Sequence, residues 1–332
     1  MKTQIKQICD KALGGSLLST NEIRELFVVP SISEESYHIQ WASRFISKKA
    51  GIAEIHGQVG VNTAACPCNC RFCSFAAANG NFKKNQVLDL EYIIQQCLQL
   101  QEQGANAIYL MATANMNFAE FLNIAGEVRL KLEPESIMIA NVRDFDYYEA
   151  LALKDAGFTG IYHALRLGEG KVTRISPGKR LETIQAAKKV GLKVGTCVEP
   201  VGPEHSLDEL VEKTIIAREI EPVFSGAARR ISIPGSNLEQ YGMVSEASMA
   251  HILAVVRLAM GPGVSGNCTH EPNNLGAIAG ANLFWAEAGF NPRDTVEKTE
   301  VNRGFDIKKC QDIFKEAEYP VLQGPSVFFA RD

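Results

Sequence analysis

From Gly51 onward, short apolar runs alternate with amphipathic stretches of helical periodicity, and this alternation restricts the fold more than any other feature. The predicted strands are Ile55–Val61, Ala107–Met111, Ser136–Asn141, Gly160–Ala164, Lys193–Cys197, Arg229–Ile233, Val264–Asn267 and Asn282–Trp285. Predicted helices between them include Glu91–Gln103, Phe118–Leu132, Tyr147–Ala156, Arg180–Val190, Leu207–Arg218 and Ala247–Met260. Repeated strand–helix units imply parallel strands joined by right-handed crossovers.

Eight such units favour a closed (β/α)8 barrel of the TIM type within the α/β class, with an open sheet as the alternative. The first 50 residues instead predict three helices, Thr3–Leu13, Thr20–Phe27 and Glu34–Ser47. We therefore expect an N-terminal helical lead-in, residues 1–50, followed by the barrel with a C-terminal segment, residues 51–332. In such a barrel the chemistry sits at the carboxyl ends of the strands.

Composition excludes several classes of partner. The net charge is −4 and no block of basic residues occurs, so nucleic-acid binding is not expected. No apolar stretch reaches 18 residues, and the N-terminus lacks the apolar run of a signal peptide, so we expect a cytoplasmic protein without a membrane span. Nine cysteines in a reducing compartment are more often ligands, nucleophiles or small buried side chains than disulfides.

Three of these cysteines, Cys66, Cys70 and Cys73, have the spacing C-x3-C-x2-C directly after the first predicted strand. A short loop of this kind can place three thiolates around one [4Fe–4S] cluster and leave the fourth iron free to bind a small molecule. A zinc site or a redox thiol pair is the alternative, although structural zinc sites usually combine two separated cysteine pairs. Phe72, just before the last cysteine, is a candidate packing wall for an adenine ring.

This C-x3-C-x-aromatic-C loop after the first strand of a barrel resembles the signature of the radical S-adenosylmethionine (SAM) superfamily. Further segments resemble biotin synthases: Lys11-Ala12-Leu13-Gly14-Gly15, Gly191-Leu192-Lys193-Val194, Val201-Gly202-Pro203-Glu204 and Ala279-Gly280-Ala281-Asn282. The resemblance implies a [4Fe–4S] cluster on the catalytic residues Cys66, Cys70 and Cys73, with SAM as the second cofactor. It also implies that Met111, Ala112 and Thr113 meet the SAM amine through backbone carbonyls, and that Arg166 and Glu169 bind the SAM carboxylate and ribose.

The other six cysteines fall into two groups. Cys9, Cys97 and Cys310 each share a helical face with apolar residues and are predicted to be structural. Cys197 and Cys268 end predicted barrel strands and Cys68 lies inside the cluster loop, so these three are predicted to bind an auxiliary Fe–S cluster.

The auxiliary site departs from the biotin-synthase pattern, in which strands two and three supply cysteines to a [2Fe–2S] cluster with an arginine ligand. Here those strands read Tyr109-Leu110-Met111-Ala112 and Met138-Ile139-Ala140-Asn141, without a cysteine. A cluster of the four-iron type, with one free iron that carries an extra sulfide, suits the cysteines present better than [2Fe–2S].

Five polar residues near strand ends are candidate substrate contacts, because an amide can pair with a ureido ring and an arginine with a carboxylate. These residues are Asn141, Arg143, Arg229, Arg230 and Asn267. His163 and His270 are further candidate ligands, although a buried histidine is more often held by hydrogen bonds. A salt bridge at the barrel rim is the alternative role for the arginines.

The resemblance implies a sulfurtransferase that inserts sulfur from the auxiliary cluster into dethiobiotin to give biotin. It further implies an electron donor such as flavodoxin or ferredoxin and a homodimer. Two alternatives remain. One is another radical SAM enzyme with the same barrel, such as a mutase or a hydrogenase-cofactor or methylornithine enzyme, and the other is a non-catalytic Fe–S or zinc protein.

Overall fold

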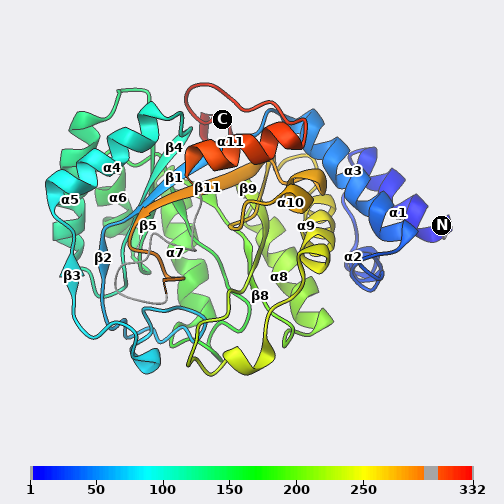
Figure 1. The fold of residues 1–332 in the computed structure, drawn as a ribbon, viewed down its shortest axis with the longest axis horizontal. Coiled ribbons are helices and arrows are strands. Elements are labelled where there is room, and N and C mark those ends of the chain that lie inside the picture. Colours follow the sequence, from blue (N-terminus) through cyan, green and yellow to red (C-terminus); the bar gives the residue numbers. More distant parts are fainter. Residues whose placement is uncertain (1–2, 295–305, 331–332) are drawn as a thin grey trace.

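Eight parallel strands form a closed ring in the computed structural model, which describes residues 3–294 and 306–330 (Figure 1). In their order around the ring they are β1 (Glu54–Gly60), β4 (Ala107–Met111), β5 (Ile137–Asn141), β6 (Gly160–Tyr162), β7 (Lys193–Gly195), β9 (Phe224–Arg229), β10 (Gly266–Cys268) and β11 (Leu283–Gly289). The ring closes where β11 pairs with β1, from Glu54 opposite Leu283 to Gly60 opposite Gly289. The predicted TIM-type barrel is confirmed.

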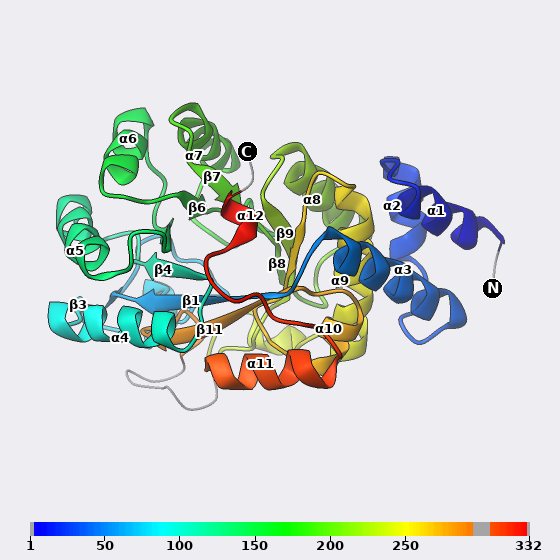
Figure 2. The same ribbon diagram turned by 90° about the horizontal axis from the view of Figure 1, so that it is seen from above.

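Helices surround the strands on the outside, as Figure 2 shows. They are α4 (Leu90–Glu102), α5 (Phe118–Lys131), α6 (Tyr147–Asp155), α7 (Pro177–Lys189), α8 (Leu207–Glu219), α9 (Glu246–Met260), α10 (Asn274–Ile278) and α11 (Ile307–Glu316). Gly104 and Gly157 follow α4 and α6 with φ of 100° and 91°, a left-handed conformation that glycine adopts without strain and that ends a helix. Cys9, Cys97 and Cys310 are buried in the apolar core, as predicted.

The strand predicted at Arg229–Ile233 is wrong, because the sixth barrel strand is Phe224–Arg229. The prediction followed the β-branched residues of Ile231-Ser232-Ile233, whereas the true strand reads Phe-Ser-Gly-Ala-Ala-Arg and has low intrinsic strand propensity. This strand needs small side chains because its neighbours β7 and β10 and the ring of Phe224 fill the space around it. The strand before it is interrupted after Gly195 and continues as β8 (Val198–Val201), which also pairs with β9.

The three predicted N-terminal helices are confirmed as α1 (Thr3–Leu13), α2 (Thr20–Phe27) and α3 (Glu34–Ala50). They lie against α9 on one side of the barrel (Figure 2). His251 of α9 joins them, since its Nδ1 lies 2.9 Å from Ser36 Oγ and its Nε2 lies 3.0 Å from the Leu26 carbonyl. Helix α9 is therefore buried on both its barrel side and its N-terminal side.

The amino end of the barrel is closed by α12 (Val327–Ala330), on the side opposite the cysteine loop (Figure 1). Glu54 Oε1 accepts the backbone N–H groups of Val327 and Phe328, while Glu54 Oε2 lies 2.8 Å from His56 Nε2. Phe328 and Phe329 enter the aromatic interior of the barrel, where they pack with Trp285 and other rings. Among the described residues, the barrel interior is thus filled from below, and its cavity lies at the carboxyl ends of the strands.

Among the described helices, none combines the length and apolar character that crossing a membrane requires.

Candidate active site

The cysteine loop follows β2 (Asn62–Thr63), a short strand that pairs antiparallel with β3 (Gln86–Val87) at the carboxyl end of the barrel. Its backbone is fixed by hydrogen bonds. Cys66 N donates to Phe75 O at 2.7 Å, Arg71 N to Val172 O at 2.9 Å, and Arg174 N to Cys68 O at 2.7 Å. The last two bonds tie the loop to the segment after β6, so the thiols are held against the barrel rim.

A cavity of about 450 Å³ lies at this end of the barrel, and most of the predicted site residues line it. Those that do are Cys66, Cys68, Cys70, Phe72, Cys73, Met111, Ala112, Thr113, Asn141, Arg143, Arg166, Arg229 and Arg230. With the other lining residues, all eight strand–helix units contribute to this one space, and the first of them carries the cysteine loop.

Glu169 and Asn267 are placed away from the cavity wall. The Glu169 carboxylate is buried and accepts hydrogen bonds from Thr173 Oγ1 at 2.6 Å and from Arg180 Nε at 3.3 Å. Asn267 precedes the inward-facing Cys268, and its side-chain amide donates to the Gly280 carbonyl at 3.0 Å on the outer side of the strand. In this structure both side chains hold protein atoms in position.

The thiols of the loop lie in different electrostatic surroundings. Hydrogen bonds from Cys68, first its thiol and also its backbone N–H, lower the pKa of Cys66 to about 6. Burial raises the pKa of Cys70 to about 11, although the positive charges of Arg166 and Arg180 act in the opposite direction. Three thiols beside one buried and one half-buried guanidinium group suit thiolate ligands of a cluster, because the positive charges offset the negative charge that ligation requires.

Six arginines line the cavity, and each of them pairs with a carboxylate. The pairs are Arg143 with Glu149 (2.6 Å), Arg166 with Glu199 (3.5 Å), Arg180 with Asp144 (3.2 Å) and Glu169 (3.3 Å), Arg229 with Glu271 (2.6 Å), Arg230 with Glu204 (2.9 Å), and Arg293 with Glu287. Such pairing keeps the guanidinium groups in place at the edge of the cavity before any ligand arrives.

Sequence reasoning missed most of the acidic partners, together with Arg180. Asp144 Oδ1 lies 2.8 Å from His163 Nε2, and Arg180 Nη1 contacts both of them. Burial, followed by the charge of Arg180, lowers the pKa of His163 to about 4, so its imidazole is neutral near pH 7. Asp144, His163 and Arg180 are separated by 17 to 36 positions in the sequence, so no local pattern predicts their contacts.

Below the cavity floor, Cys197 and Cys268 face each other across β9. Gly226 lies beside Cys268 in the sheet register, and the neighbouring pair Val198–Ala227 places Cys197 on its other side. Both cysteines are at most 2% exposed. A Cβ at Gly226 would lie 2.1 Å from the Cys268 carbonyl oxygen, so only glycine allows the strands this close approach.

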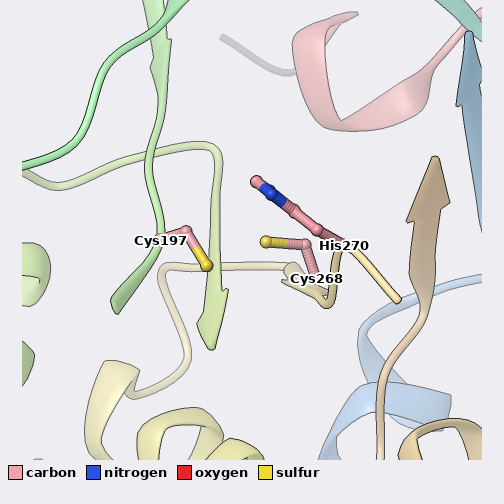
Figure 3. A group of neighbouring side chains, drawn as sticks. All are labelled: Cys197, Cys268 and His270. Carbon is pink, nitrogen blue, oxygen red and sulfur yellow. The ribbon is translucent and has the colours of Figure 1, made fainter. Parts of the chain in front are cut away.

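His270 completes a group with these two thiols (Figure 3). One ligand atom from each of the three residues lies within 4.8 Å of the others. Burial on its own would raise the pKa of Cys268, but hydrogen bonds from Cys197 and His270 hold it below its usual value. Cys68 is not a member of this group, because its thiol is hydrogen-bonded to Cys66 in the loop above.

The trio Cys66, Cys70 and Cys73 fits the predicted [4Fe–4S] cluster, whereas only Cys197 and Cys268 of the three cysteines predicted for the auxiliary cluster lie together. The trio lines the cavity, and the rest of the wall combines apolar side chains, among them Phe72 and Trp285, with polar groups. The buried pair offers two thiols at a place where Gly226 and Ala228 contribute almost no side-chain volume. Soft, closely spaced sulfur donors are the ligands that Fe–S clusters require.

The barrel, the cysteine loop and the family comparison agree on the class of protein. Residues 62–215 match the family model described as the Radical SAM superfamily, so the chain carries a radical SAM domain. Among curated proteins it is similar to the biotin synthase of Desulforudis audaxviator, with 26% identity over 77% of this chain and 80% of the relative. The biotin synthase of Geotalea uraniireducens is 24% identical over 70% of this chain and 71% of the relative.

Solved structures with the same fold include methylornithine synthase (PylB), with a TM-score of 0.78 at 17% identity over 97% of this chain and 98% of that chain. The FeFe-hydrogenase maturase HydG from Carboxydothermus hydrogenoformans also gives a TM-score of 0.78 at 17% identity, over 98% of this chain and 80% of that chain. These likenesses confirm the barrel and the helices around it.

Proposed function

We propose that this radical SAM enzyme is a biotin synthase-like sulfurtransferase that converts dethiobiotin to biotin with sulfur from an auxiliary Fe–S cluster. The observation that carries the proposal is the buried pair Cys197 and Cys268, which lies directly beneath the cavity lined by Cys66, Cys70 and Cys73. The similarity to curated proteins named biotin synthase supports the same substrate.

In this proposal Cys66, Cys70 and Cys73 hold the [4Fe–4S] cluster and the buried cysteines hold the auxiliary one. When bound, the first cluster supplies the electron that cleaves SAM and the second supplies the sulfur. The protein positions the reacting carbon of the substrate between the two sites and keeps water and oxygen out.

The residues assigned to SAM are the ones nearest the cysteine loop. The Met111 carbonyl accepts the Val61 N–H and the Thr113 carbonyl accepts the Met116 N–H, which favours the Ala112 carbonyl as the acceptor for the SAM ammonium group. Phe72 lies in the cavity wall as the candidate adenine contact, and Arg166 is the candidate for the carboxylate. We propose only an indirect role for Glu169, through its contact with Arg180.

The residues assigned to dethiobiotin lie on the other strands. Asn141 donates to Gln58 Oε1 at 3.0 Å, and together these two amides offer the paired donors and acceptors that a ureido ring needs. Arg230 uses Nε and Nη2 for Glu204, while its Nη1 has no partner among the described residues and is the candidate contact for the substrate carboxylate. Arg143 and Arg229 flank the same space, and we leave Asn267 out of the site.

A one-electron donor such as flavodoxin or ferredoxin, a homodimer and a cytoplasmic location complete the proposal. Each of these rests on the family resemblance, and the electron donor follows from the need to reduce a cluster before SAM can be cleaved.

The proposal is tested by anaerobic incubation of reconstituted enzyme with dithionite, SAM and dethiobiotin, with separate measurement of 5′-deoxyadenosine and biotin. We expect both products from the unchanged protein. Cys197→Ala and Cys268→Ala should still form 5′-deoxyadenosine but no biotin, because the cysteine loop is unaltered. Cys97→Ala, which removes a buried thiol far from the cavity, is the matched control and should retain both activities.

Each alternative predicts a different result. Biotin formation by the Cys197 and Cys268 variants would disprove sulfur donation from this pair. Formation of 5′-deoxyadenosine with methylornithine or hydrogenase-cofactor precursors, but not with dethiobiotin, would indicate another enzyme of the same barrel. Absence of 5′-deoxyadenosine from protein that carries an intact [4Fe–4S] cluster would favour a non-catalytic protein.

A further inference from the structure

We propose that His270, rather than Cys68, is the third protein ligand of the auxiliary cluster, which gives that site a Cys197–Cys268–His270 ligand set. This inference rests on the proposed function, because it concerns the cluster that the sulfur-transfer proposal requires. It differs from the prediction made from sequence, which combined the two strand-end cysteines with Cys68.

The barrel arranges its inward residues on β7–β8, β9 and β10 in layers. The lowest layer holds Phe224, whose ring and Cβ fill the space beside Gly195 and Gly266. The next layer holds Cys197 and Cys268, with Gly226 between them. Above it, Glu199, Ala228 and His270 line the cavity floor.

Phe224 blocks the region beneath the thiols, so a cluster bound by Cys197 and Cys268 extends upward, toward the cavity. In that direction Ala228 is small, and His270 offers a ring nitrogen within 4.8 Å of both thiols (Figure 3). Histidine is an established alternative to cysteine as an Fe–S ligand, as in Rieske centres, where two histidines bind one iron.

The contacts of the imidazole prepare one nitrogen for ligation. Glu199 Oε2 lies 3.3 Å from His270 Nδ1 and can accept a hydrogen bond from Nδ1–H, a tautomer that leaves the lone pair on Nε2. Tyr162 OH lies 3.2 Å from Nε2, on the side of the thiols. A carboxylate behind the ring of a ligating histidine is the usual way in which proteins fix the tautomer and orientation of that ligand. We therefore assign Glu199 as a positioning residue.

Cys68 lacks such an arrangement. It lies in the loop two residues from Cys66, its thiol is hydrogen-bonded to Cys66, and its carbonyl accepts the N–H of Arg174. These contacts hold Cys68 with the SAM-cluster trio, and it is not among the residues grouped around Cys197.

The test isolates the auxiliary site by using the full chain with Cys66, Cys70 and Cys73 replaced by alanine as the parent. Parent and variants are reconstituted anaerobically with ferrous iron and sulfide, and iron per chain is measured after desalting. The reduced cluster is then examined by pulsed electron paramagnetic resonance in protein labelled with ¹⁵N-histidine and in unlabelled protein. Thermal unfolding of each variant checks that it remains folded.

We expect the parent to bind iron and to show a nitrogen coupling that changes on ¹⁵N labelling. His270→Ala should lose at least half of the iron, and His270→Cys should restore the iron without the nitrogen coupling. Cys68→Ala, the matched control, should keep both, whereas Glu199→Gln should keep iron and change the coupling.

Loss of iron from Cys68→Ala with full retention by His270→Ala would overturn the ligand assignment and leave the sulfur-transfer proposal intact. A parent whose cluster spectrum is unaffected by ¹⁵N-histidine would likewise overturn the His270 assignment and leave the sulfur-transfer proposal intact. A parent that binds no cluster, or binds zinc alone, would overturn both the assignment and the proposed function.

Discussion

Replacement of Gly226 by alanine places a methyl group where the structure has the backbone of the neighbouring strand. The added Cβ would lie 2.1 Å from the carbonyl oxygen and 2.4 Å from the nitrogen of Cys268. Since these are backbone atoms, β10 has to move away from β9 before the methyl group fits. Cys268 moves with its strand, so the same substitution separates the two thiols.

The cost in stability has two parts. Forcing a methyl group into a packed interior typically costs about 1–3 kcal/mol. The φ of 152° at Gly226 is unfavourable for alanine and adds about 1–2 kcal/mol. The sum is about 2–5 kcal/mol. With an unfolding entropy of about 2.1 cal/mol/K per residue, a chain of 332 residues should lose about 3–7 °C in Tm.

Calorimetry of the apoprotein measures Tm, and iron analysis after reconstitution measures cluster binding. We expect Gly226→Ala to lower Tm and to lose auxiliary iron while it still forms 5′-deoxyadenosine. Gly126→Ala is the control, because its Cβ meets nothing within 4 Å on helix α5 and should stabilise the protein by about 0.5–1 kcal/mol. An unchanged Tm and full auxiliary iron in Gly226→Ala would refute the argument.

Two further predictions concern buried histidines. The pKa of His163 is lowered to about 4 in the folded protein, so below pH 6.5 the unfolded chain binds a proton at this residue and the folded chain does not. As the pH falls from 6.5 to 5, this difference lowers the free energy of unfolding by about 2 kcal/mol. His163→Gln should remove this part of the loss in urea unfolding, and equal pH sensitivity of both proteins would contradict it. Glu54→Ala deprives His56 and the first N–H groups of α12 of their acceptor, which should cost about 3 kcal/mol. The folded Glu54→Ala protein should cleave SAM as the unchanged protein does. Loss of SAM cleavage without a lower Tm would disprove a purely structural role for Glu54.

The alternation of apolar runs and amphipathic helices was sufficient to predict the barrel, because each strand–helix unit carries its own local signal. The sixth strand was placed five residues too late, since Phe224–Arg229 is shaped by its neighbours rather than by its propensity. A small error at a strand end also reverses the side on which a residue points. This explains why Asn267 was expected in the cavity, whereas Cys268 is the inward residue.

The cavity was predictable only in part. The cysteine spacing pointed to Cys66, Cys70 and Cys73, and the strand ends pointed to Cys197 and Cys268. The contacts that organise them connect distant positions, as in the pairing of Arg180 with Asp144 and of His270 with Glu199. Only folding brings such partners together, and a single sequence contains no local sign of them.

Glu199 divides its carboxylate between two neighbours that belong to different sites. Oε1 faces Arg166 at 3.5 Å, and Oε2 faces His270 at 3.3 Å. A ligand that moves Arg166 changes the contact between Glu199 and the His270 imidazole. A metal bound to that imidazole changes the contact between Glu199 and Arg166. Thermodynamic linkage requires the two effects to be equal in free energy. With SAM on Arg166 and an auxiliary cluster on His270, as proposed, the affinity for SAM would measure what occupies the lower site. The ratio of the two dissociation constants, with and without auxiliary iron, would give the strength of the coupling.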